Sequence, residues 1–145
     1  MVNDHVTYKL AKLLNNTIFS DLNSDYYAAE DVDVTYDNYL GVDHYKEGDL
    51  ITEGDNIHGK YYYAPYISEV LDKLLEIGIV IDFESCFTFA LTTHVGYFYK
   101  VYKINEEEAK LDLLFEEKEW FSSKYQALYD IITRLIEENI ITKEI

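Results

Sequence analysis

The spacing of strand-like segments in the second half of the chain restricts it to an antiparallel sheet. Four stretches have the composition of strands, 79–83, 86–92, 95–104 and 111–116, and short polar turns such as 105–108 separate them. Parallel neighbours would need crossover connections of about a dozen residues or more, and these gaps are shorter. We therefore expect an antiparallel β-meander of about four strands.

Helical periodicity brackets this meander. The clearest helix lies near the C-terminal end, where Ser122 and Ser123 can begin it and where Lys124, Asp130, Arg134 and Glu137 should point outward. Its apolar positions step by four and three residues: Phe121, Tyr125, Leu128, Ile132 and Leu135. A second helix should follow Pro65 and end at Gly78, because Ile67, Val70, Leu71, Leu74 and Leu75 have helical spacing.

A third helix is expected at the beginning of the chain. Val6, Leu10, Leu13 and Leu14 recur at helical spacing, Asn3 or Asp4 can cap the first turn, and Asn15-Asn16 should end it. Helices packed on an antiparallel sheet define an α+β domain, and we expect a single domain over residues 1–145.

Both faces of the predicted strand 95–104 carry apolar side chains. One face has Val95, Tyr97, Tyr99 and Val101, and the other has Phe98, Tyr102 and Ile104. Either helices cover both faces, or one face meets a partner or a second copy of the chain.

Acidic residues are concentrated in an insertion-like segment, residues 20–59. It holds eleven acidic residues and one lysine, so it contributes −10 of the net charge of −16. Val32 and Val34 alternate with polar neighbours, as in a strand with one wet face. Glu-Gly-Asp triplets at 47–49 and 53–55 predict turns around a short strand at 50–52. We expect an irregular hairpin with loops here.

The charge excludes some partners and favours others. A chain with this excess of carboxylates repels nucleic acid and anionic membrane surfaces, so we expect neither as a direct partner. A protein with a basic or nucleic-acid-binding surface would be attracted.

Three features of the sequence bear on its compartment. Cys86 has no second cysteine to pair with, no apolar run approaches ~20 residues, and the first residues lack a signal-peptide pattern. We expect a cytoplasmic protein.

Catalytic and metal-binding patterns are weak. Asp31, Asp33 and Asp37 suggest a calcium loop, but the glycine and glutamate that an EF-hand requires are replaced by Tyr36 and Val42. Cys86 and His94 could be a nucleophile and a base, yet nothing marks an orienting acid or an oxyanion site. We expect no catalytic residue, no metal site, no cofactor and no enzymatic activity.

Tyrosines cluster in and beside the acidic segment. Nine of the fifteen lie there: Tyr26, Tyr27, Tyr36, Tyr39, Tyr45, Tyr61, Tyr62, Tyr63 and Tyr66. Tyrosine favours protein interfaces because it buries a large area at low entropic cost, but it also favours strands. Both interpretations stay open. The candidate interaction surface consists of Asp31, Asp33, Asp37, Tyr36, Tyr39, Tyr61, Tyr62 and Tyr63.

A resemblance covers residues 1–14 and 60–140. Leu10-Ala11-Lys12-Leu13-Leu14, Tyr63-Ala64-Pro65 and the run from Tyr97 to Ile104 (YFYKVYKI) occur in this order, followed by the amphipathic helix. In these features the chain resembles small uncharacterised proteins encoded by phages and prophages of gut bacteria. The resemblance implies a phage-associated setting and an α+β domain, and no chemistry.

Three functional hypotheses follow. The first is a non-enzymatic interaction protein that acts through its acidic, tyrosine-rich surface, in a sharper form as a DNA mimic directed at a host nucleic-acid-binding protein. The second is a small structural or assembly protein that self-associates, as a homodimer, through the tyrosine-bearing strand. The third is a metal-dependent enzyme that uses the aspartate cluster.

Overall fold

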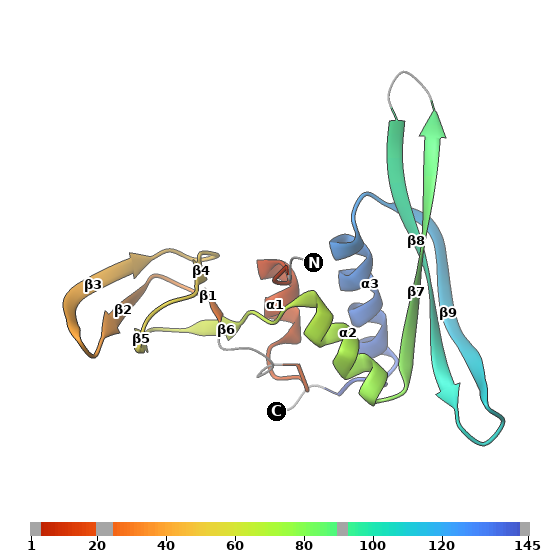
Figure 1. Cartoon of the computed structure of the whole chain (residues 1–145), viewed down its shortest axis with the longest axis horizontal. Coiled ribbons are helices and arrows are strands. Elements are labelled where there is room, and N and C mark those ends of the chain that lie inside the picture. Colours follow the sequence, from red (N-terminus) through yellow and green to blue (C-terminus); the bar gives the residue numbers. More distant parts are fainter. Residues whose placement is uncertain (1–3, 20–24, 90–92, 143–145) are drawn as a thin grey trace. The chain divides into compact units, whose positions relative to one another are not determined.

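The computed structural model describes residues 4–19, 25–89 and 93–142, and it confirms a mixed α+β fold (Figure 1). The described residues form three helices and nine strands, and the strands make three antiparallel sheets. Backbone contacts divide the chain into an N-terminal unit, which extends to Val70, and a C-terminal unit from Leu71 to Ile141. The prediction of a single domain stays a prediction.

The C-terminal unit contains a three-stranded sheet in which the strands are longer and fewer than predicted. Its strands are β7 (Ile79–Phe89), β8 (Thr93–Asn105) and β9 (Lys110–Phe121), in the order β7-β8-β9. The predicted break between 79–83 and 86–92 is wrong: Glu84 and Ser85 stay extended and pair with Phe98 and Tyr97. Glu84 is also held by an ion pair across the ladder, 3.1 Å from Lys100. Residues 90–92 lie outside the described part.

Helix α3 (Lys124–Glu137) covers one face of this sheet. Ser123 caps it, as predicted, and its hydroxyl accepts a hydrogen bond from the Gln126 N–H at 3.2 Å. Phe121 belongs to β9 and not to the helix, contrary to the sequence prediction. The buried stripe of α3 comprises Ala127, Leu128, Ile131, Ile132 and Leu135.

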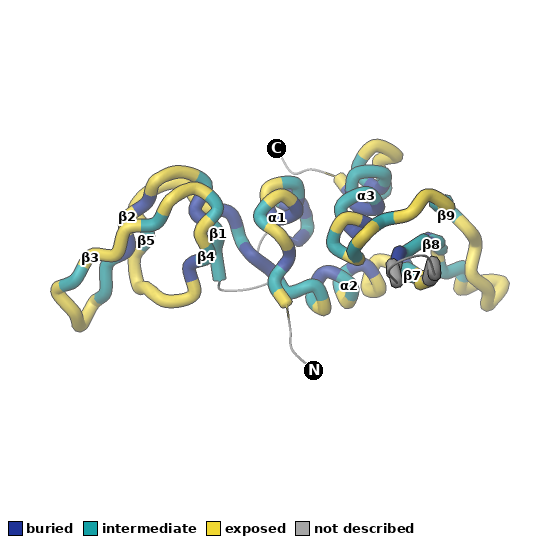
Figure 2. The backbone as a smooth tube through the Cα atoms, turned by 90° about the horizontal axis from the view of Figure 1, so that it is seen from above, coloured by how far each residue is buried: buried dark blue, intermediate teal, exposed yellow. Residues whose placement is uncertain are grey.

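The two faces of β8 are buried to different extents. Tyr99 and Val101, on the face toward α3, are 1% and 0% exposed. On the opposite face, Leu111 and Leu113 of β9 lie beside Ile104 and Tyr102 and are about half exposed, at 50% and 51%. Within the described residues, one face of the sheet is therefore only partly covered (Figure 2).

Helix α2 (Ile67–Glu76) has the predicted end, and α1 (Tyr8–Leu14) has a different beginning. Gly78 ends α2 in a left-handed conformation at φ 84°, which a glycine adopts without strain. The N-cap of α1 is Thr7, not Asn3 or Asp4, and its hydroxyl accepts from the Leu10 N–H. His5 and Val6 are not helical, because His5 forms a β-bridge with Tyr66 and Val6 donates its N–H to the Pro65 carbonyl at 2.9 Å.

The acidic segment is more regular than predicted. It contains β1 (Tyr26–Ala28), β2 (Val32–Tyr36), β3 (Tyr39–Tyr45), β4 (Leu50–Ile51) and β5 (Asn56–His58), and β6 (Tyr61–Tyr63) follows. These strands form two sheets, in the orders β4-β1-β6 and β3-β2-β5. The predicted short strand is β4, and it lies between Gly48 and Gly54, which have φ values of 90° and 138°.

An apolar cluster holds these small sheets together. Val32 and Val34 are 2% and 0% exposed, while the alternating Asp33 is exposed, which confirms the strand pattern with one wet face. The remaining members are Ala28 and Ile51, with Tyr26, Tyr36, Tyr45 and Ile57 packed against them. Several tyrosines of the segment therefore serve its own core. No helix in the described ranges has the length and apolar character needed to cross a membrane.

Candidate interaction surface

The β2–β3 hairpin ends in a turn that carboxylates stabilise. Asp37 lies in the turn, and its N–H donates to Oδ2 of Asp55 at 2.6 Å. Its own Oδ1 accepts from the Asn56 side-chain amide at 3.2 Å. These two bonds tie the hairpin end to the segment around β5, so the turn has a defined shape.

Apolar side chains are exposed next to this turn. Tyr39 is 67% exposed, Leu40 is 105% exposed and Val42 is 49% exposed. We call these three residues the apolar tip. The ring of Tyr39 lies over Gly41, where an added Cβ would be only 2.0 Å from the ring. Gly41 thus allows Tyr39 to fold back over the strand and leaves Leu40 projecting alone.

Two carboxylates flank the tip on β2 and β3. Oδ2 of Asp43 accepts a hydrogen bond from the Tyr36 hydroxyl at 2.5 Å. That bond, more than any burial, raises the pKa of Tyr36 to about 12. Asp33 contacts Nδ1 of His44 on the exposed face, and the neighbouring His58 contacts Thr35 at 3.1 Å between Nε2 and Oγ1. The tip is therefore bordered by groups that are negative or polar.

The predicted tyrosines of β6 lie on the other small sheet. Tyr61 is 38% exposed and Tyr62 is 6% exposed, while Tyr63 is half-buried. Tyr61 and Tyr63 share a face with Tyr26, at ring-centroid distances of 4.8 and 5.3 Å from it. Tyr62 alternates to the opposite face, where its ring lies 6.0 Å from that of Tyr8.

The structure thus distributes the predicted surface residues over two sheets. Asp33, Tyr36 and Tyr39 belong to the β3-β2-β5 sheet, with exposed Asp31 immediately before β2 and Asp37 in the turn. Tyr61, Tyr62 and Tyr63 belong to the β4-β1-β6 sheet. Leu40 and Val42 were not predicted, although two apolar residues beside a hairpin turn were a visible signal.

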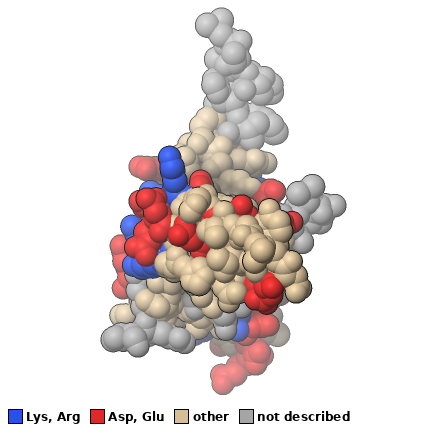
Figure 3. Space-filling model, turned by 90° about the vertical axis from the view of Figure 1, so that its left-hand side faces the viewer, with Lys and Arg blue, Asp and Glu red and all other residues tan. Residues whose placement is uncertain are grey.

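Acidic side chains on this part of the molecule are interspersed with uncharged residues. Figure 3 looks onto the side of the β2–β3 hairpin and shows a broad uncharged area with acidic groups at its margins, some of them beside basic side chains. Some acids have local structural partners: Glu30 accepts from the Lys60 N–H at 2.8 Å, and Asp49 accepts from the Lys46 N–H at 2.9 Å. Glu47 accepts from the Tyr8 hydroxyl at 3.0 Å.

Catalytic and metal-binding candidates do not assemble in the part of the chain that the structure describes. Within it, no three His, Cys, Asp or Glu side chains are grouped so that they could hold a metal ion. In the β7–β8 ladder Cys86 pairs with Gly96, and His94 pairs with Thr88. The side chains of Cys86 and His94 lie outside the described residues.

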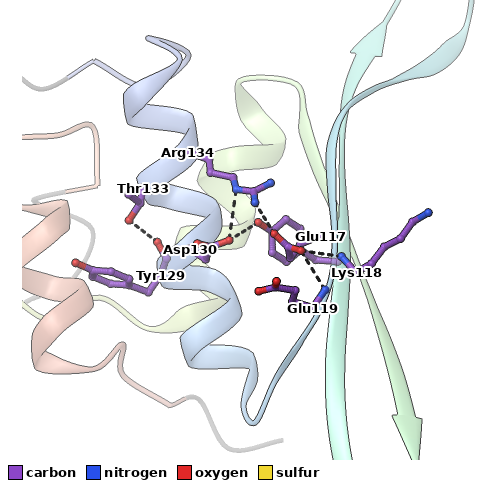
Figure 4. A network of polar contacts seen from close by, with 8 residues as sticks. Glu117, Lys118, Glu119, Tyr129, Asp130, Thr133 and Arg134 are labelled. Carbon is purple, nitrogen blue, oxygen red and sulfur yellow. Dashed lines mark hydrogen bonds and ion pairs between the residues drawn. The ribbon is translucent and has the colours of Figure 1, made fainter.

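A polar network that the sequence did not predict joins α3 to the sheet of the C-terminal unit (Figure 4). The Tyr99 hydroxyl donates to Oδ2 of Asp130 at 2.5 Å, and Arg134 bonds Oε2 of Glu117 at 2.5 Å. The Arg134 Nε also lies 3.5 Å from Oδ2 of Asp130. The prediction that Asp130 and Arg134 point outward is wrong, because each is held by a partner on the sheet.

The electrostatics of this network are structural. Burial, followed by the hydrogen bond to Asp130, raises the pKa of Tyr99 well above its ordinary value. The backbone N–H of Glu119, together with Arg134 and the N–H of Lys118, lowers the pKa of Glu117. Tyr99 therefore stays protonated, and Glu117 stays ionised beside Arg134. The network can fix the helix on the sheet, and it presents no activated base or nucleophile.

Comparisons with known proteins add no further assignment. No protein-family model matches this chain, and neither the curated proteins nor the solved structures include a significant match.

Proposed function

We propose that this chain is a non-enzymatic interaction protein that docks onto another protein through the apolar tip and its flanking carboxylates. The observation that carries the proposal is the full exposure of Leu40 at the end of a hairpin with a defined turn. The partner presents an apolar pocket surrounded by basic groups, as a protein with a nucleic-acid-binding surface can. A phage-associated setting belongs to this proposal and would place the partner in a bacterial host.

The two kinds of side chain contribute differently to such docking. Burying a leucine side chain stabilises a complex by about 2 kcal/mol, and Val42, on the same strand, is a further exposed apolar side chain that a partner can cover. The carboxylates contribute less to affinity than to the rate and choice of encounter, because exposed charges are screened by salt. Apolar anchoring with acidic steering selects a basic partner over nucleic acid.

DNA mimicry is the sharper form of this proposal. It would require carboxylates in a continuous row, spaced as phosphates are along a strand. The exposed apolar residues between Asp37 and Asp43 favour the more general form. Competition distinguishes the two, because a DNA mimic should be displaced from its partner by duplex DNA.

Site-specific crosslinking tests the docking proposal. A photoreactive phenylalanine analogue replaces Leu40, or Leu111 as a control, since Leu111 is also exposed but lies in the other unit. In a bacterial lysate at low salt, we expect a discrete crosslinked protein from position 40 and none from position 111. The same product from both positions, or none from position 40 across several hosts, would contradict the proposal.

Self-association is the second candidate function, and the half-exposed Leu111 and Leu113 on β9 favour it. Apolar burial is not screened by salt, so a dimer formed through this face should persist at high ionic strength. Light scattering over a concentration series measures this directly. A monomer at every concentration, with a Leu113→Ser variant that behaves like the parent, would eliminate the homodimer.

A further inference from the structure

Strand β3 is an open edge of the β3-β2-β5 sheet. It runs for seven residues, Tyr39–Tyr45, and its ladder partner is β2. Among the described residues, no backbone hydrogen bond outside that ladder involves residues 39–45. Its side chains are mostly exposed, so a row of backbone donors and acceptors faces water.

The register identifies which backbone groups are open. The Thr35 carbonyl points toward β5, because it accepts from the Asp55 N–H at 3.1 Å. Successive residues of a strand direct their backbone groups to alternate sides, so Val34 faces β3, where it pairs with Asp43. On β3, Asp43 therefore faces β2, while the backbone groups of Val42 and His44 face outward.

Over residues 42–45, this edge has no lysine, proline or bulge of the kind by which proteins usually prevent strand addition. Lysine, proline and bulges on the outer strand are the common protections. Strand β9 has such features, with Lys110 and Lys118 and two irregularities in its ladder. Strand β3 has neither lysine nor proline. Its one irregularity lies beside the turn: Thr35 pairs with Val42 and Tyr36 with Tyr39, so Leu40 and Gly41 are extra residues in β3, and the register is regular from Val42 to Tyr45.

Charge decides which strand can add here. The segment 20–59 carries a net charge of −10, so the same segment of a second copy is repelled. An extended peptide with basic side chains is attracted by that field, and its apolar side chains can lie beside Leu40 and Val42. Strand addition supplies affinity through main-chain bonds and specificity through alternate side chains.

We propose that the open edge of β3 binds an extended basic peptide as an added β-strand. This inference rests on the proposed function, because it specifies the form in which a basic partner is bound beside the apolar tip. The bonds that form are those of the outward N–H and C=O groups of Val42 and His44 with the peptide backbone.

A seven-residue peptide that alternates lysine and valine tests the proposal on the full chain. Two isomers of it carry N-methyl groups, one on every lysine nitrogen and one on every valine nitrogen. In an added strand, either the lysine or the valine backbone nitrogens face β3, and the other set faces water. The isomer methylated on the set that faces β3 should bind about thirtyfold more weakly than the parent peptide, as expected for two lost hydrogen bonds. The other isomer should bind like the parent peptide. A glutamate–valine peptide should not bind.

Hydrogen exchange of single amides provides the second readout. Saturating lysine–valine peptide at low salt should slow exchange at Val42 and His44 by about tenfold or more and leave Asp43 unchanged, because only outward amides gain a partner. Proline at position 42 removes an N–H that faces water, so an edge strand tolerates it and the fold should persist. The Val42→Pro variant should nevertheless lose peptide binding, because the peptide needs that donor. Val42→Thr should retain peptide binding.

The outcomes separate this inference from the proposed function. Absence of binding, equal weakening by both methylated isomers, or unchanged exchange at Val42 and His44 would refute strand addition. A discrete crosslink from position 40 alongside any of these results would leave tip docking intact. Peptide addition at β3 without a crosslink from position 40 would instead support the edge and reject the tip.

Discussion

Removing one hydroxyl from the polar network of the C-terminal unit should weaken that unit measurably. The Tyr99→Phe variant keeps the ring, which is 1% exposed, and deletes the bond to Asp130 at 2.5 Å. A hydrogen bond to a charged group contributes about 1.5–3 kcal/mol. Because the Asp130 side chain is 36% exposed, water can replace the phenol, so we expect a loss at the lower end, about 1.5–2 kcal/mol.

Trp120 makes this loss measurable in the correct unit. It is the only tryptophan in the sequence and lies in β9, so its fluorescence during urea unfolding reports on the C-terminal unit. If the free energy of unfolding falls by about 2 kcal/mol per molar urea, the urea concentration at the unfolding midpoint should fall by nearly 1 M in the Tyr99→Phe variant. Tyr97→Phe is the matched control, because Tyr97 lies on the same face of β8 and its hydroxyl has no hydrogen bond among the described residues.

The stability difference between the parent and Tyr99→Phe should depend on pH if the hydroxyl bond to Asp130 causes it. The pKa of Tyr99 is raised in the folded state, so above about pH 10, the ordinary value, the unfolded chain loses a proton that the folded chain keeps. The stabilisation by Tyr99 is thus complete below that pH and decreases above it, and the gap between parent and Tyr99→Phe should narrow. A constant gap, or an equal loss in Tyr97→Phe, would refute the role of the hydroxyl bond.

Four further variants test the Glu117–Arg134 pair, the glycine turns and the apolar tip. Glu117→Gln should lower the free energy of unfolding by about 1–2 kcal/mol at neutral pH. Because folding lowers the pKa of Glu117, the stability difference between parent and variant in urea titrations should close as the pH falls below 4.5 and through the folded pKa. An unchanged difference would count against the ion pair with Arg134. Gly54→Ala should lower the free energy of unfolding by about 3 kcal/mol and Gly48→Ala by about 1 kcal/mol, measured by tyrosine circular dichroism on heating. Both glycines have positive φ, but only a Cβ at position 54 meets Val34, at 2.1 Å. Equal losses in the two variants would contradict this reasoning. Leu40→Ser should change stability by less than about 0.5 kcal/mol, since Leu40 packs on nothing, and a larger loss in the same assay would show that the tip is structural.

Elements with one dominant local signal were predictable from the sequence. The Ser123 cap, the Gly48 and Gly54 turns and the alternation of Val32 and Val34 each depend on a few adjacent residues. The Glu84-Ser85 position was misread because polar residues usually interrupt a strand. There, a partner on the neighbouring strand, Lys100, compensates for the charge, and sequence order alone does not reveal it.

The polar network could not be predicted for a related reason. On a helix wheel, Asp130 and Arg134 flank the apolar stripe and resemble solvent-facing residues. Their orientation depends on Tyr99 and Glu117, which come from two different strands. The register of β9 against β8, which includes a bulge between Tyr97 and Tyr99, brings Glu117 opposite Tyr99. Periodicity identifies which face of an element is apolar, but not which polar residues at its border meet a partner.

The charge of the acidic segment has a different meaning once its hydrogen bonds are known. Glu30, Asp49 and Asp55 each accept from a backbone N–H, so these carboxylates stabilise turns in a segment of short strands that leaves many donors unpaired. Part of the net −10 is therefore required by the fold and is dispersed over its turns. The carboxylates at the docking surface are fewer, chiefly Asp33 and Asp43 beside the apolar tip. Salt should consequently weaken binding to a basic partner by an amount that reflects these few charges, while the apolar contact of Leu40 persists.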